Sequence, residues 1–120
     1  MSDLLGNEKI SPWVSFEANY QSAYIAEHSE SPELALKHNQ EAEKINTDHK
    51  IFDNHHSRLA GLRTNLSMSL RQANEFDLAK HYADLSIRAY SNDRARRIKA
   101  KINMGQVLIC LLYTSDAADE

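Results

Sequence analysis

Glycine, proline and cysteine are scarce in this sequence of 120 residues, which contains three, two and one of them. This scarcity excludes a collagen-like chain, a low-complexity linker and a small domain held together by disulfides. The longest uninterrupted apolar run, residues 107–113, is far shorter than the roughly 20 residues that a transmembrane helix needs. An excess of positive charge is also missing, since 14 basic and 17 acidic residues give a net charge of -3, which argues against a polybasic nucleic-acid-binding protein.

The composition that remains is that of an ordinary globular domain. Hydrophobic residues make up 42% and charged residues 26%, which is enough apolar surface for one core in a chain of one-domain length. The first ten residues are polar and aperiodic, and they lack the basic and apolar regions of a signal peptide. We therefore predict a loose leader over residues 1–10 and a cytoplasmic protein.

The last eleven residues, 110–120, have the sequence CLLYTSDAADE. Over their whole length they resemble the translation of a transposase-type sequencing adapter, and the helical pattern before them breaks after Ile109. We therefore predict a non-native tail over 110–120 and a helix that ends near Ile109; the alternative is a natural C-terminus that frays. Because the one cysteine, Cys110, lies in this tail, we predict neither thiol chemistry nor a cysteine-based metal site.

Amphipathic segments predict about five helices, and no stretch alternates with the period of two that is typical of strands. Ser11-Pro12 and Ser31-Pro32 each combine a hydroxyl cap with a proline at the first helical position. These two signals predict helices over residues 12–28 and 32–46. The sequence therefore predicts an all-α fold.

The middle and the end of the chain continue the helical pattern. Residues 48–73 are predicted to form one long helix or two abutting ones, ended by Asn74, which tolerates the left-handed conformation. A further helix is predicted over 76–90, and Ser91-Asn92-Asp93 is predicted to cap a last helix. The apolar stripes of the middle and last helices are Leu59, Leu62, Leu66 and Leu70, and Ala95, Ile98, Ile102, Gly105 and Leu108.

An internal repeat joins these helices in pairs. Residues 32–42 and 76–86 have similar sequences. In each segment a small residue lies twelve positions after a small residue of the preceding helix. These pairs are Ala23 with Ala35 and Ser67 with Ala79. Helices that cross closely need small side chains at the contact, so we predict that each pair marks a helix crossing.

On these residues the chain resembles the tetratricopeptide repeat, a pair of antiparallel helices with small residues at fixed positions. The matching positions are Leu66-Ser67, Leu70, Phe76, Ala79 and Ser86, then Met104-Gly105 and Leu108, and also Ala23, Ala26, Ala35 and Ala42. The steps of 44 and 38 residues between copies are longer than the usual period of about 34. The resemblance implies an α-solenoid of antiparallel helix pairs over residues 11–109, truncated in its third repeat.

The resemblance also implies a function, because tetratricopeptide solenoids line a concave peptide-binding groove with their first helices. The residues that it places at this groove are Tyr20, Gln21, Tyr24, Glu27, Thr64, Asn65, Met68, Arg71, Gln72, Asn103 and Gln106. Amide side chains can pair with a peptide backbone, while tyrosine and methionine offer adaptable apolar contact. We therefore predict a non-enzymatic scaffold or sensor module that binds a protein or peptide segment and needs no cofactor. The alternative is that the tyrosines pack between helices and that the amides are solvated.

Two other functions stay open from the sequence. In the first alternative, the chain is the sensory repeat region of a larger bacterial-type regulator. In the second, it is a metal-dependent enzyme fragment that uses its histidine cluster. This cluster consists of His49, Asp53, His55 and His56. Because only His49 and Asp53 are spaced to share a metal and no catalytic motif is present, we predict no metal site and no enzyme.

Basic residues gather at the start of the last predicted helix. They are Arg94, Arg96, Arg97, Lys99 and Lys101. They could meet an acidic partner or a phosphate backbone, but a solvated face of an amphipathic helix explains them equally simply. We predict the solvated face, and hence neither nucleic acid nor membrane as a partner.

In this pattern the last helix has no second helix to cover it, so we predict that its apolar face is exposed and that the chain self-associates through it. Residues 107–113 add an uncharged segment of high β-propensity to this face. We expect light scattering to find a smaller monomer fraction for the full chain than for a chain that ends at Asp93, at equal concentrations. Equal monomer fractions would contradict this prediction.

Overall fold

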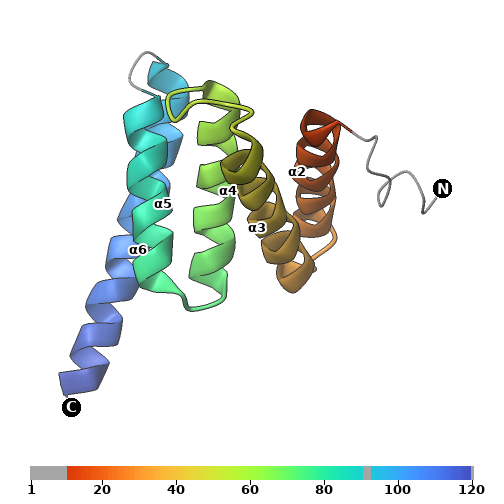
Figure 1. Ribbon diagram of the computed structural model, residues 1–120. Coiled ribbons are helices and arrows are strands. Elements are labelled where there is room, and N and C mark those ends of the chain that lie inside the picture. The colour runs from red at the N-terminus through yellow and green to blue at the C-terminus, as the bar shows by residue number, and fades with distance from the viewer. Residues whose placement is uncertain (1–10, 91–92, 120) are drawn as a thin grey trace. The chain divides into compact units, whose positions relative to one another are not determined.

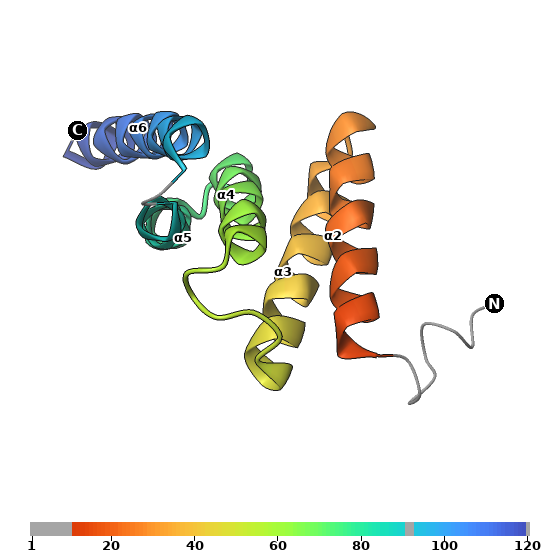
Figure 2. The same cartoon turned by 90° about the horizontal axis from the view of Figure 1, so that it is seen from above.

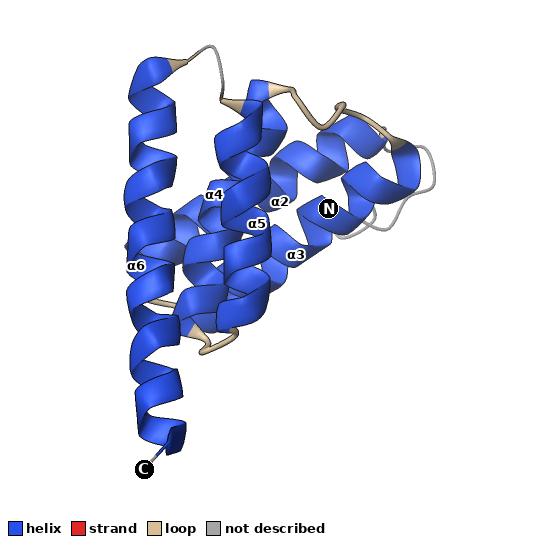
Figure 3. Cartoon of the chain, turned by 90° about the vertical axis from the view of Figure 1, so that its left-hand side faces the viewer, coloured by secondary structure: helices blue, strands red, loops and turns tan. Residues whose placement is uncertain are grey.

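The computed structural model describes residues 11–90 and 93–119, with side chains up to Thr114 (Figure 1). In this part of the chain it contains the helices α2 (Pro12–His28), α3 (Pro32–His49), α4 (Ser57–Gln72), α5 (Phe76–Ala89) and α6 (Arg94–Asp119). The described residues form no strand and most of them are helical, which confirms the predicted all-α class (Figure 3). The predicted leader lies outside the described residues.

The chain divides into two compact units between Asp53 and Asn54. The first unit consists of α2 and α3, which pack against each other as a helical hairpin (Figure 1). The second unit contains α4, α5 and α6. Here α5 packs against both of its neighbours, and α6 also contacts α4 (Figure 2).

The two helix starts predicted in the first unit are confirmed in position, but only one of them is capped by its serine side chain. The Oγ atom of Ser11 accepts a hydrogen bond from the backbone N–H of Trp13 at 3.2 Å, and Pro12 occupies the first turn of α2. Ser31 also precedes a helix that starts with proline, but its side chain makes no capping bond. Only the carbonyl oxygen of Ser31 takes part, by accepting from the N–H of Ala35 at 3.0 Å.

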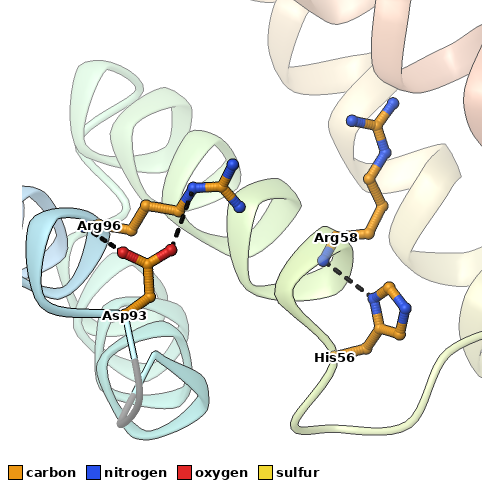
Figure 4. Close-up of polar contacts among 4 residues, drawn as sticks. All are labelled: His56, Arg58, Asp93 and Arg96. Atoms are coloured by element: carbon orange, nitrogen blue, oxygen red, sulfur yellow. Dashed lines mark hydrogen bonds and ion pairs between the residues drawn. The ribbon is translucent and has the colours of Figure 1, made fainter.

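Side chains also cap the starts of α4 and α6 (Figure 4). The Nδ1 atom of His56 accepts from the backbone N–H of Arg58 at 3.0 Å, which the sequence did not predict. Asp93 was predicted as part of a cap, and its Oδ1 atom accepts from the backbone N–H of Arg96 at 3.1 Å. The other two residues of that predicted cap, 91–92, lie outside the described residues.

Two of the connections between helices turn in the same way. Glu30 after α2 and Asn74 after α4 both take the left-handed conformation, with φ values of 56° and 65°. In each turn the following N–H returns to a carbonyl of the last helical turn, from Ser31 to Ala26 and from Glu75 to Leu70, at 2.9 Å in both. Since Glu30 and Asn74 are 44 residues apart, the sequence repeat is also a repeat of backbone geometry.

The predicted close crossings are confirmed in both hairpins. Ala23 and Ala35 are buried in the first, and Ser67 and Ala79 are buried in the second. In the second hairpin the Oγ atom of Ser67 donates to the carbonyl oxygen of Ala79 at 2.7 Å. Only a small side chain at each position permits such a close approach of two helices.

Larger side chains fill the space beside these crossings. Phe16 is fully buried in the first unit and meets the ring of Phe52 edge-on, with 5.1 Å between the ring centroids. In the second unit Ala60, Tyr90 and Ala100 form a buried cluster that joins α4, α5 and α6. The predicted leucine stripe of α4 is confirmed, because Leu59, Leu62, Leu66 and Leu70 are all buried.

The predicted helix over 48–73 is wrong in its first part, because α4 begins only at Ser57. Lys50 takes the left-handed conformation, with a φ of 51°, and its N–H bonds to the carbonyl of Asn46 at 2.7 Å. The side-chain oxygen of Asn46 then accepts from the N–H of Phe52 at 2.8 Å. These bonds end α3 without the glycine or proline that would have marked the break in the sequence.

The predicted helix end near Ile109 is also wrong, because α6 continues to Asp119. The hydroxyl of Thr114 donates to the carbonyl of Cys110 at 2.8 Å, so this polar residue is accommodated within the helix. The last turns of α6 extend beyond the ends of α4 and α5 (Figure 3). The non-native origin of residues 110–120 stays a prediction.

The crossing in the second unit can be tested by enlarging one of its small residues. We expect Ala79→Leu to lower the free energy of unfolding by about 1–3 kcal/mol, because the added carbons separate α4 from α5. The neighbouring exposed change Lys80→Leu is the control and should alter stability by less than about 0.5 kcal/mol. Urea unfolding followed by circular dichroism gives both values, and equal effects would contradict the close crossing.

Candidate functional site

One side of α2 presents polar and aromatic groups to solvent. Gln21, Tyr24 and His28 follow one another at helical spacing on this side, and we call them the α2 face. The side chain of Tyr24 is 50% exposed, and its ring lies against the ring of His28 with 4.2 Å between the centroids. A bond of 2.8 Å between the Nδ1 atom of His28 and the carbonyl oxygen of Tyr24 holds the histidine there. The sequence reasoning missed His28, although its spacing of four from Tyr24 is a usable signal.

The corresponding side of α4 carries a similar set. Asn65, Met68 and Gln72 lie 44 residues after the members of the α2 face, and we call them the α4 face. Gln72 is exposed, while Asn65 and Met68 are half-buried. Each face thus combines hydrogen-bonding side chains with one large, adaptable side chain, tyrosine or methionine.

Four other predicted groove residues lie at the margins of these faces or on α6. Tyr20 is half-buried beside Phe16, with 6.2 Å between the ring centroids, and Glu27 is half-buried as well. Arg71 is half-buried, and its Nε atom is buried without a hydrogen-bond partner. Gln106 is exposed on α6.

Two of the predicted groove residues are inside the second unit instead, so their assignment to an open groove is corrected. Thr64 donates to the carbonyl of Ala60 at 3.1 Å and pairs with the hydroxyl of Ser86. Asn103 is buried on α6, and its Nδ2 atom donates to the Oγ atom of Ser67 at 2.9 Å. Only the amide nitrogen of Asn103 is paired across the contact, since its Oδ1 atom is buried without a hydrogen-bond partner.

The apolar face of α6 is exposed, as predicted. Large side chains on this face include Ile98, Ile102, Leu108 and Ile109, each 45–59% exposed. The opposite face, which contains Ala100 and Val107, is the one buried in the second unit. At Gly105, a Cβ atom would meet nothing within 4 Å.

The histidine cluster and the basic residues at the start of α6 lie on the surface. Among the described residues no group of three histidine, cysteine, aspartate or glutamate side chains is arranged to hold a metal ion. His55 and His56 are exposed, and His56 serves as the cap of α4. The basic residues at the start of α6 are all exposed, and Arg96 lies 3.4 Å from the carboxylate of Asp93 (Figure 4).

None of the described helices combines the length and the apolar character that crossing a membrane requires. Comparison of the chain with protein-family models, with curated proteins and with solved structures gives no match in any of the three.

The internal role of Asn103 can be tested through its hydrogen bond with Ser67. We expect Ser67→Ala and Asn103→Ala each to lower the free energy of unfolding by about 1–3 kcal/mol, because Ser67→Ala leaves the buried Nδ2 atom of Asn103 without its acceptor and Asn103→Ala removes the same buried hydrogen bond. The double variant should cost less than the sum of the two. As the control, Asn65→Ala on the α4 face should change stability by less than about 0.5 kcal/mol. Urea unfolding measures the stability of all four variants. If Asn103→Ala lowers the free energy of unfolding as little as Asn65→Ala does, the internal role of Asn103 is wrong and its assignment to the groove is restored.

Proposed function

We propose that the chain is a non-enzymatic scaffold of tetratricopeptide-like helical hairpins that binds a segment of a partner protein. One observation carries the proposal. Two hairpins that share a turn geometry carry similar sets of side chains at corresponding positions, Gln21, Tyr24 and His28 on α2 and Asn65, Met68 and Gln72 on α4. Residues that are at least partly exposed and that repeat with the fold at the same positions are a better indication of a binding surface than scattered exposed residues are.

The chemistry of the two faces suits a peptide rather than a small molecule or a nucleic acid. Glutamine and asparagine amides both donate and accept, as peptide backbones do. Tyr24 and Met68 offer apolar contact that adapts to different side chains. Neither face contains lysine or arginine, the side chains that neutralise a phosphate backbone, and Arg71 at the margin of the α4 face is half-buried.

The helices also make binding less costly in entropy. Tyr24 is already held against the ring of His28, and both hairpins are fixed by the buried crossings described above. A side chain that is ordered before binding loses less rotamer freedom when the partner arrives. The two faces therefore act as ordered contact surfaces without a disorder-to-order transition.

The proposal can be tested with peptides selected from a random-sequence display library on the immobilised chain. We expect each selected peptide to bind about tenfold or more weakly to at least one of the variants Tyr24→Ala and Met68→Ala, as removal of a central interface side chain does. Fluorescence anisotropy with labelled peptides measures the affinities, and thermal unfolding confirms that the variants are folded.

Exposed residues on the second helices provide matched controls. Gln40→Ala on α3 and Lys80→Ala on α5 remove side chains that are exposed but lie outside both faces. Their affinities should stay within about twofold of the unchanged chain, the level expected of residues outside an interface. Failure to select any peptide, or equal losses in the control variants, would overturn the proposal.

A further inference from the structure

The exposed side of α6 carries a regular apolar stripe that extends over most of the helix. Its members are Ala95, Ile98, Ile102, Gly105, Ile109 and Leu112, at steps of three, four, three, four and three. Ile98, Ile102, Ile109 and Leu112 are 50%, 59%, 55% and 62% exposed. This alternation of three and four is the heptad spacing by which two helices pack along a common seam.

The position of the stripe on α6 matches the face of α4 that already receives a helix. Residues 38 positions earlier than Ile98, Ile102 and Gly105 are Ala60, Thr64 and Ser67. Ala60 packs against Tyr90, Thr64 pairs with Ser86, and Ser67 donates to the carbonyl of Ala79. All three partners lie on the side of the antiparallel helix α5. The stripe therefore corresponds to a face that accepts an antiparallel helix.

We propose that this helix is α6 of a second copy of the chain, so that two copies pair antiparallel through their stripes. Reversing the stripe against itself generates layers in which the side-chain volumes match. In these layers Ala95 lies opposite Leu112 of the second copy, Ile98 opposite its Ile109, and Ile102 opposite its Gly105. Small residues thus face large ones at the ends and the centre of the seam, which is the condition for close packing of two helices.

Charge along α6 determines the orientation. The first eight residues of the helix include Arg94, Arg96, Arg97, Lys99 and Lys101. Antiparallel pairing keeps these two basic starts at opposite ends of the seam. Parallel pairing would place the basic starts side by side, which like-charge repulsion disfavours.

Gly105 gives the seam room at its centre. A Cβ atom there would meet nothing within 4 Å, and the lack of a side chain lets Ile102 of the second copy approach the helix backbone. This pairing is independent of the α2 and α4 faces, since none of their residues belongs to the stripe. It therefore goes beyond the proposed peptide binding and can fail or succeed separately from it.

Sedimentation equilibrium of the full chain, kept reduced, is the first test. We expect a reversible dimer, and we expect Ile98→Asp and Ile102→Asp each to weaken it about tenfold or more by placing a charge in the apolar seam. Ile25→Asp on α2 is the matched control, because Ile25 is 64% exposed and lies outside α6. A full chain that stays monomeric up to about 100 μM, or an equal loss of dimer in the control, would overturn the proposal.

Disulfide trapping then tests the orientation. In chains with Cys110→Ser, a tagged Ile98→Cys chain is mixed with an untagged Ile109→Cys chain and oxidised. The antiparallel seam predicts mainly mixed disulfides between the two chains, because residues 98 and 109 lie in the same layer. A majority of disulfides between identical chains, as a parallel seam would give, contradicts the pairing.

Discussion

Close contact of helix backbones at small residues is the constraint on which the rest of the structure depends. Ala23 against Ala35 in the first unit and Ser67 against Ala79 in the second determine where the helices of each hairpin cross. A larger side chain at any of these positions would separate the helices and expose the neighbouring core. The position of every other residue on these helices, including the α2 and α4 faces, follows from the crossing because helical geometry then fixes its direction.

The two units use this constraint with different chemistry. The first crossing pairs two alanines, with a part-buried bond of 2.9 Å between the Nδ1 atom of His38 and the Oδ1 atom of Asn19 linking the same helices. The second crossing is itself hydrogen-bonded inside the core, with Ser67 at the centre of bonds to Ala79 and Asn103. Apolar contacts tolerate small changes of angle, but a hydrogen bond between buried groups is satisfied in only a narrow range of geometry. The second unit is therefore the more specifically defined of the two, and its polar bonds also attach α6, the helix that carries the apolar stripe.

The sequence predicted the features that depend on local signals or on regular spacing. The start of α2 at Pro12, the left-handed Asn74 and both crossings follow from caps, turn residues and the spacing of small residues. The non-helical segment 50–56 was missed because Lys50 is an unusual residue for a left-handed position, and because the turn also depends on a hydrogen bond from the N–H of Phe52 to the Asn46 side chain. The internal positions of Thr64 and Asn103 were missed for a similar reason: burial of a polar residue depends on a partner from another helix, which spacing along one helix does not reveal.

The repeated turn at Glu30 and Asn74 has a consequence for the order in which the chain folds. Each turn joins two helices whose buried crossing residues are only twelve positions apart in the sequence, so hairpin formation closes a short loop with a small loss of chain entropy. Chains whose contacts are mostly local fold quickly, without waiting for distant segments to meet. Each hairpin can therefore form its crossing early and separately, and attachment of α6 through the more distant bond of Asn103 to Ser67 is a later step.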